Sequence, residues 1–168
     1  LMTRRSITLI KALIILACTL PFAFLVARLF GVGTLGANPV QEVLHTLGKT
    51  GLNLILITLT VTPARKLSGM NWLIALRRSL GLAAFVYVLL HATTYAALDL
   101  HFAWSTLFED ITQRPYITVG FAALLLLIPL AATSTNAMQR RLSRNWLKLH
   151  RATYAVAILG VMHYFWQV

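Results

Sequence analysis

The sequence is poor in charged residues and has almost no cysteine. Only 11% of its 168 residues are charged, four are Asp or Glu, and the single cysteine is Cys18. One cysteine excludes a disulfide framework and a thiolate-bound metal cluster. There is no HExxH motif, and "GVGTLG" lacks the strand and helix that a nucleotide-binding loop needs, so we interpret it as a flexible turn. No carboxylate lies at the centre of an apolar segment, where it could relay ions.

Apolar residues dominate instead. They make up 58% of the chain, and the mean hydropathy is +0.75, which is typical of a membrane protein. The net charge of +11 would suggest a nucleic-acid partner for a soluble protein, but the basic residues form short clusters between apolar segments. Membrane topology explains this distribution, so we expect contact with a lipid bilayer and none with nucleic acid.

Five apolar segments are long enough to cross a bilayer, which requires about 20 residues. They lie near residues 7–30, 40–63, 79–98, 115–133 and 149–167. The sequence therefore predicts an all-α, polytopic membrane helical bundle with five transmembrane helices, forming one domain over residues 1–168 without an internal repeat. The first segment continues well past Pro21, which favours a retained helix over a cleaved signal peptide. Pro63 is predicted to close the second helix, and Pro115 to lie near the start of the fourth.

The basic residues predict the orientation of this bundle. Only Arg28, Lys49 and Arg114 lie near one side, which also holds all four acidic residues. The other side holds twelve of the fifteen Lys and Arg residues: Arg4, Arg5, Lys11, Arg65, Lys66, Arg77, Arg78, Arg140, Arg141, Arg144, Lys148 and Arg151. By the positive-inside rule this second side is cytoplasmic, and the N-terminus lies there.

Two histidines are predicted to reach the same depth in the membrane. His91 lies thirteen residues beyond Arg78, a rise of roughly 20 Å, and His163 lies twelve beyond Arg151, a rise of roughly 18 Å. Both helices run from the cytoplasm outward. A haem with two imidazole ligands needs one histidine on each side of the macrocycle, and such a site transfers electrons. The alternative for each histidine alone is a buried side chain that is hydrogen-bonded to Tyr or Thr.

The remaining candidates surround this pair. Tyr87 and Tyr95 share a helical face with His91, and they suit a cofactor pocket. His150 lies nearer the cytoplasmic surface, where it could support a second haem or the point at which electrons enter. Arg77 lies nearly in phase with His91, fourteen residues before it, so Arg77 or Arg78 is predicted to pair with a haem propionate; ordinary anchoring at the membrane surface is the alternative. His45 could line the haem or an electron path, or lie at the interface, and His101 is assigned no role.

The whole chain resembles a known family of membrane proteins. The resemblance rests on "GANPVQEVLHTLGKTGL", "LITLTVTPARKL", "LRRSLGLAAFVYVLLHATTYA", "ITQRPYITVG" and "ATSTNAMQRRLSRNWLKLHRATYAVAILGVMHYFW". These segments are similar to the MsrQ family, the haem-binding membrane subunits of bacterial periplasmic methionine sulfoxide reductase systems, within the ferric reductase-like transmembrane superfamily. The family usually has a sixth helix, whereas this sequence has its last residues shortly after His163.

The resemblance implies a b-type cytochrome of the bacterial inner membrane, with His91, His150 and His163 at the positions of the family's haem ligands. It implies one haem or two, and FMN as a further cofactor. Electrons would come from the quinone pool or a cytoplasmic flavin reductase and pass to a periplasmic molybdopterin-containing methionine sulfoxide reductase, which repairs oxidised periplasmic proteins. The chain would be the electron-transfer subunit, so we assign no catalytic residue. The alternatives are another quinol-oxidising cytochrome b, a ferric reductase, or a transporter of protons or metal ions.

Overall fold

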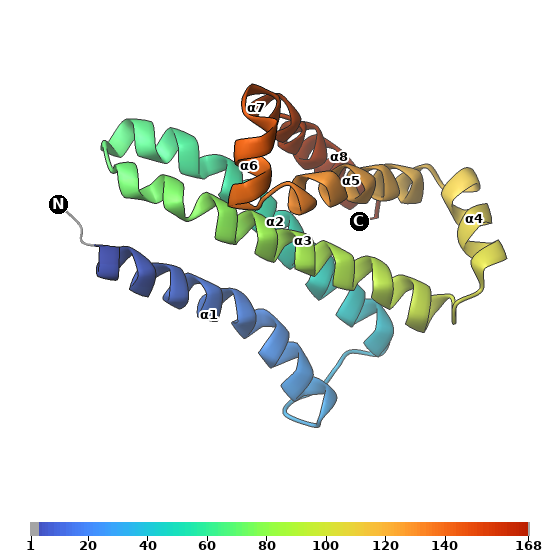
Figure 1. Cartoon of the computed structure of the whole chain (residues 1–168). Coiled ribbons are helices and arrows are strands. Elements are labelled where there is room, and N and C mark those ends of the chain that lie inside the picture. Colours follow the sequence, from blue (N-terminus) through green and yellow to red (C-terminus); the bar gives the residue numbers. More distant parts are fainter. Residues whose placement is uncertain (1–3, 168) are drawn as a thin grey trace. The chain divides into compact units, whose positions relative to one another are not determined.

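The computed structural model describes residues 4–167, and they form helices joined by short turns (Figure 1). The described residues contain no strand, which confirms the all-α prediction. In chain order the elements are α1 (Arg4–Leu29), α2 (Pro39–Ser68), the 3-10 helix η1 (Asn71–Ala75), α3 (Arg77–Thr94), the π-helix η2 (Tyr95–Asp99), α4 (Trp104–Gln113), α5 (Pro115–Ala132), α6 (Asn136–Leu142), α7 (Arg144–His150) and α8 (Ala152–Gln167).

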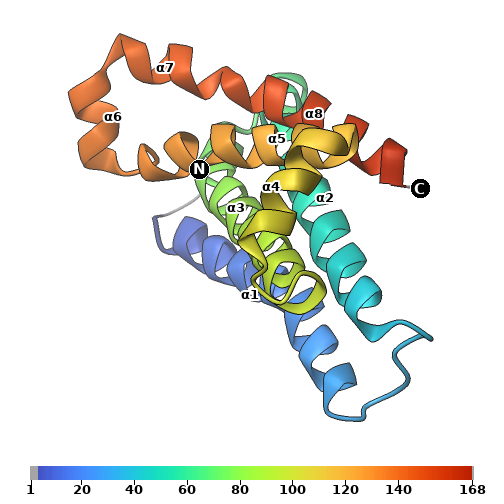
Figure 2. The ribbon, with the colours of Figure 1, turned by 90° about the vertical axis from the view of Figure 1, so that its right-hand side faces the viewer.

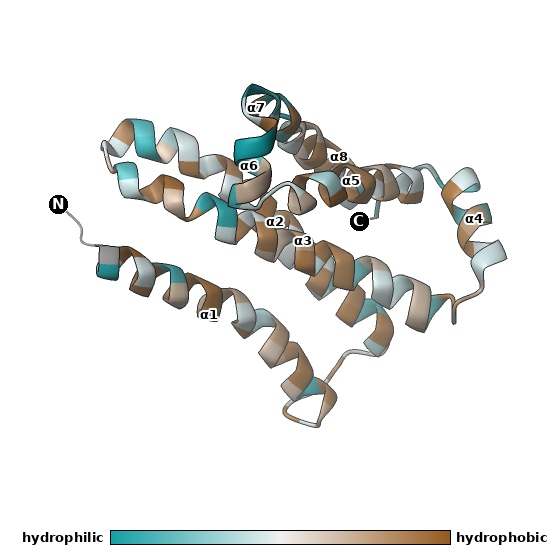
Figure 3. Cartoon of the chain, in the orientation of Figure 1, coloured by the Kyte–Doolittle hydropathy of each residue, from teal (hydrophilic) through white to brown (hydrophobic). Residues whose placement is uncertain are grey.

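Several of these helices can cross a membrane. Among the described residues, four segments are long and apolar enough: Arg5–Leu29, Pro39–Ser68, Asn71–Asp99 and Pro115–Ala132. The fifth predicted segment is also helical, but α8 has 16 residues and is shorter than the roughly 20 that a full span requires. Helix α1 exposes large apolar side chains such as Leu13 and Phe24, as expected for a helix in contact with lipid, and it is mostly brown in Figure 3. The chain is therefore a polytopic helical membrane protein.

The ends of α2 correct one prediction and illustrate ordinary capping. Asn38 caps the N-terminus by accepting a hydrogen bond from the Gln41 amide at 3.2 Å, and Pro39 occupies the first turn. The prediction that Pro63 closes this helix is wrong, because α2 continues to Ser68. A proline near the end of a helix removes only one amide donor. The helix ends instead at Gly69, whose left-handed backbone (φ +71°) lets its N–H reach the Arg65 carbonyl.

The contacts divide the chain into two compact units, Leu1–His91 and Ala92–Val168. In the first unit, α2 and α3 run antiparallel, since the position of a Cβ on Gly51 would lie 2.9 Å from Val88 and that on Gly81 would lie 3.7 Å from Thr58. Small residues at such points let two helix backbones approach closely. The expectation of a single domain stays a prediction.

A tyrosine joins α1 to α3 within the first unit. The Tyr87 hydroxyl donates to the Cys18 carbonyl at 2.6 Å and accepts from the Phe22 amide at 3.2 Å. These two backbone groups are four residues apart in α1, so the hydroxyl is inserted into the hydrogen-bond ladder of that helix. Tyr87 is buried as a result, and its ring belongs to the core of the first unit.

The second unit is built on the antiparallel pair α5 and α8, which lie side by side in Figures 1 and 2. Its core comes from both helices: Ala123, Leu127, Leu130, Val156 and Ala157 are buried, and Val156 is 0% exposed. The basic segment between α5 and α8 contains the two short helices α6 and α7, which are largely hydrophilic (Figure 3). Between them Ser143 adopts φ +47°, which ends α6 and begins α7.

Candidate cofactor-binding histidines

His91 is held by the backbone of the neighbouring helix. It lies in the last turn of α3 and is half-buried, and its Nδ1 is 2.9 Å from the Leu44 carbonyl oxygen of α2. A carbonyl can only accept, so Nδ1 carries the proton and donates it. In a neutral imidazole the lone pair is then on Nε2, and this is the nitrogen that can bind iron.

His163 repeats this arrangement in the second unit. It is half-buried in α8, and its Nδ1 donates to the Tyr116 carbonyl of α5 at 2.7 Å. The Tyr116 ring lies beside the imidazole, with ring centroids 6.3 Å apart. Because the Tyr116 carbonyl can only accept, the lone pair of a neutral His163 lies on Nε2.

A glycine lies against each of these imidazole rings. A Cβ on Gly48 would be 3.1 Å from His91 Nδ1, and a Cβ on Gly120 would be 2.7 Å from His163 Nδ1. In both units the carbonyl partner precedes its histidine by 47 residues, and the glycine follows that carbonyl by four. The sequence alone predicted no internal repeat, and neither glycine was among the predicted site residues. The equal spacing from glycine to histidine was the available signal.

His150 has different partners from the other two histidines. Its Nε2 lies 3.1 Å from the Thr133 hydroxyl, and its ring stacks on Trp146 with centroids 3.9 Å apart. Trp146 in turn donates its indole N–H to the Thr133 carbonyl at 2.9 Å. The Thr133 hydroxyl donates to Pro129 at 2.7 Å, so it accepts from His150 Nε2. In this structure His150 therefore belongs to a polar cluster at the C-terminal ends of α5 and α7.

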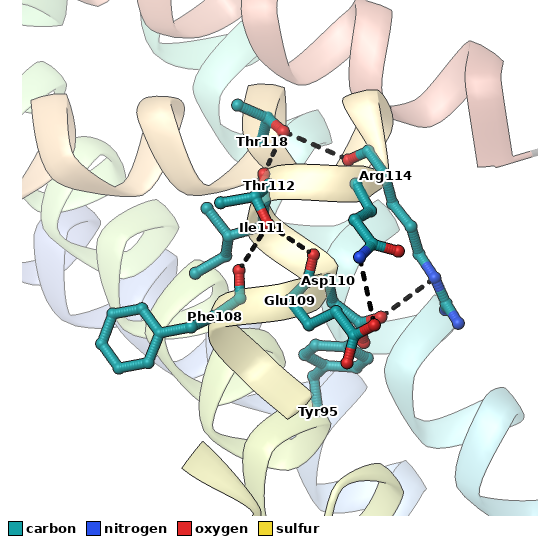
Figure 4. Close-up of polar contacts among 9 residues, drawn as sticks. Tyr95, Phe108, Glu109, Asp110, Ile111, Thr112, Arg114 and Thr118 are labelled. Carbon is teal, nitrogen blue, oxygen red and sulfur yellow. Dashed lines mark hydrogen bonds and ion pairs between the residues drawn. The ribbon is translucent and has the colours of Figure 1, made fainter. Parts of the chain in front are cut away.

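Tyr95 lies where α3 gives way to a π-helical turn. Its hydroxyl donates to the buried Asp110 carboxylate, which also accepts from Arg114 Nε at 3.0 Å (Figure 4). A hydrogen bond with Tyr116 and the charge of Asp110 both raise the pKa of Arg114, so its guanidinium stays charged. The polar end of Tyr95 is thus directed to α4, and only its ring remains available to line a pocket.

The other candidates lie near the ends of helices in the first unit and in a loop of the second. Arg77 and Arg78 occupy the first turn of α3; Arg77 is half-buried and Arg78 exposed. His45 lies in α2 and, with Glu42 and Lys49, lines an open pocket of about 500 Å³. His101 is exposed, in the turn before α4, with φ +48°.

Each of these imidazoles, in its neutral form and with Nδ1–H bonded to a carbonyl of its own unit, has Nε2 as the nitrogen that a haem iron accepts as a ligand. The apolar helices around them suit the porphyrin ring. The side chains of His91 and His163 therefore fit this cofactor. No comparable group of residues can be assigned to a flavin in the described part of the chain.

Comparison with known proteins agrees with this chemistry. Residues 46–161 match the family model described as ferric reductase like transmembrane component. Three relatives are named protein-methionine-sulfoxide reductase heme-binding subunit MsrQ. The one from Xanthomonas axonopodis pv. citri is 46% identical over 99% of this chain and 78% of its own length. The relative from Xanthomonas campestris is 52% identical over 82% of this chain and 63% of its own length. The relative from Herminiimonas arsenicoxydans is 48% identical over 96% of this chain and 74% of its own length. No solved structure matches the chain.

Proposed function

Because the chain belongs to the ferric reductase-like transmembrane family, whose MsrQ members it resembles over almost its whole length, we propose that it is the haem-binding subunit of a methionine-sulfoxide reductase system. Its role is electron transfer, and the sulfoxide chemistry belongs to the partner subunit. The observation that carries the proposal is the matched pair of histidines, each with Nδ1–H donated to a backbone carbonyl. Membrane helices seldom carry ionisable residues without a function.

We propose that His91 and His163 would hold a b-type haem through their Nε2 atoms. A haem with two imidazole ligands supplies one-electron transfer without an open coordination position for substrate. Each histidine would contribute its Nε2, with the ring oriented inside its own unit by the carbonyl that accepts from Nδ1–H. The ring of Tyr95, one turn beyond His91, would line the haem pocket, and Arg77 and Arg78 would pair with the propionates.

His150 is proposed to support a second haem or the entrance for electrons on the cytoplasmic side. To bind iron through Nε2 it would have to leave Thr133, to which Nε2 now donates. The stacked Trp146 and the surrounding basic residues suit a site at the membrane surface, since tryptophan and arginine favour the interface.

The charge distribution and the family support electron flow from the cytoplasmic side outward. The basic clusters support an N-terminus in the cytoplasm of a bacterium whose inner membrane holds the protein. Electrons then come from the quinone pool or from a cytoplasmic flavin reductase, and FMN is a further cofactor of this electron transfer. They pass outward to a periplasmic molybdopterin-containing subunit that reduces methionine sulfoxide in oxidised proteins.

The test is the reduced-minus-oxidised absorption spectrum of the purified protein, produced with ample haem. We expect the bands of a b-type haem in the wild type, and their loss in His91→Ala and in His163→Ala. His101→Ala is the matched control, because this histidine is exposed in a turn, and it should keep the full spectrum. A wild-type protein without haem contradicts the proposed function. Full haem content in both ligand variants contradicts the ligand assignment alone.

The acceptor needs a separate experiment. The reduced protein is mixed with the purified periplasmic reductase and methionine sulfoxide, and reoxidation of the haem is followed by stopped-flow absorption. Reoxidation only when both are present supports the proposed partner. Reoxidation by ferric citrate alone, with no response to the reductase, would favour a ferric reductase.

A further inference from the structure

The carbonyls that hold His91 and His163 share an unusual exposure. In an α-helix the carbonyl of residue i accepts from the amide of residue i+4, and its second lone pair is normally covered by the side chain at that position, because Cβ points toward the N-terminus. Four residues after Leu44 stands Gly48, and four residues after Tyr116 stands Gly120. The absence of a side chain at these positions leaves room for an imidazole beside the carbonyl.

We propose that Gly48 and Gly120 are positioning residues for the axial histidines, each uncovering a helix carbonyl that fixes the ring orientation and the Nδ1–H tautomer needed for iron binding through Nε2. We call each arrangement a histidine clamp: Leu44, Gly48 and His91 in the first unit, and Tyr116, Gly120 and His163 in the second. This inference rests on the proposed function, since the clamp prepares a ligand for haem.

The recurrence of the clamp supports a functional origin. The three positions of one clamp are each 72 residues from their counterparts in the other, from 44 to 116, 48 to 120 and 91 to 163. Each helix pair also buries the same faces, although the side chains differ. The buried counterparts at this offset are Gly51 and Ala123, Ile55 and Leu127, Thr58 and Leu130, Val61 and Thr133, and Ala84 and Val156. The pair α2 and α3 and the pair α5 and α8 thus hold a histidine in the same way, although most other residues differ between the two pairs.

The clamp has two physical effects on a ligand. Donation from Nδ1–H to a carbonyl increases the basicity of the other nitrogen, which favours ferric over ferrous iron and lowers the reduction potential. A ring that is already oriented also loses less conformational entropy when it binds. Loss of the clamp should therefore weaken haem binding and raise the potential.

Alanine at either glycine tests the clamp with little risk to the fold. The added Cβ would meet an imidazole ring, the movable end of a side chain, at 3.1 Å in Gly48→Ala and 2.7 Å in Gly120→Ala. The ring can rotate away from the carbonyl, and alanine is a better helix former than glycine. Because the contact is closer at Gly120, that substitution should have the larger effect.

The first measurement needs no haem. The full-length protein is produced without haem, labelled with ¹⁵N-histidine, and studied by NMR at alkaline pH, where imidazoles are neutral. We expect the Nδ1–H tautomer for His91 and His163 in the wild type. Gly48→Ala should change the signal of His91 alone, and Gly120→Ala that of His163 alone.

The second measurement is haem affinity and reduction potential in the same variants. Loss of partners of a metal ligand typically lowers metal affinity by about 10- to 100-fold, and we expect a loss in this range with a higher potential. Gly81→Ala is the matched control, because its Cβ would lie 3.7 Å from Thr58, in ordinary contact and away from histidine. Gly51→Ala controls for helix packing: it crowds Val88 without touching His91, and should leave the tautomers unchanged.

The outcomes separate the clamp from the function on which it rests. A wild type that binds haem, with glycine variants that keep both the tautomers and the affinity, overturns the clamp and leaves the proposed function intact. Equal losses of affinity in Gly51→Ala and Gly48→Ala, with unchanged tautomers, also overturn it, because the glycine then acts only in packing. A wild type that binds no haem overturns the proposed function, and the role of the clamp toward haem with it.

Discussion

The contact between Tyr95 and Asp110 should contribute more to stability than the ion pair between Asp110 and Arg114. The Asp110 side chain is 7% exposed, whereas that of Arg114 is 54% exposed. A hydrogen bond to a buried charged group contributes about 1.5–3 kcal/mol. An ion pair with an exposed arginine contributes about 0–1 kcal/mol, since water screens it. A double-mutant cycle with Tyr95→Phe and Asp110→Ala should therefore give a coupling energy of about 1.5–3 kcal/mol.

The assay is unfolding of the purified protein in detergent micelles by titration with SDS, followed by circular dichroism. The comparison cycle uses Arg114→Ala with Asp110→Ala and should give a coupling of less than about 1 kcal/mol. Glu109→Ala is the control on the same helix, because it removes only an exposed contact with Gln113 at 3.1 Å. If the arginine cycle gives the larger coupling, or if Tyr95 and Asp110 prove additive, the assignment of the dominant contact is wrong.

Two further predictions concern the first unit. Gly51→Ala should destabilise the protein, because overpacking against the stiff Val88 side chain costs about 1–3 kcal/mol and exceeds the gain of about 1 kcal/mol in helix propensity. Gly81→Ala has only the gain in helix propensity and should stabilise the protein. SDS titration of both variants checks these opposite signs, and equal shifts in stability would refute the packing argument. Tyr87→Phe removes the hydroxyl inserted into α1, which should loosen the contact between α1 and α3 and speed maleimide labelling of Cys18, the only thiol in the chain. Unfolded protein gives the labelling rate of a fully accessible thiol. An unchanged labelling rate in Tyr87→Phe would show that the inserted hydroxyl does not hold the two helices together.

Much of the fold could be predicted from the sequence because a membrane helix satisfies its own backbone hydrogen bonds. An apolar segment of sufficient length is then helical whatever it packs against, so the predicted segments match α1, α2, α3, α5 and α8 closely. The same local reasoning failed at Pro63, where α2 continues to Ser68. Helix α4 was also not predicted, because it is short and its buried Asp110 bonds to Tyr95, which lies outside the helix.

The candidate ligands were chosen by residue type and by depth, which depend only on position along a helix. The sequence by itself thus determined that the chain is a polytopic helical membrane protein and that His91 and His163 lie at similar distances from basic helix ends. Which nitrogen of each ring carries the proton depends on a carbonyl 47 residues earlier in the chain. That partner is set by the rotation and register of two packed helices, and by the glycine that lets them bring ring and carbonyl together. Only the tertiary structure could decide it, because such contacts leave no periodicity in the sequence of either helix.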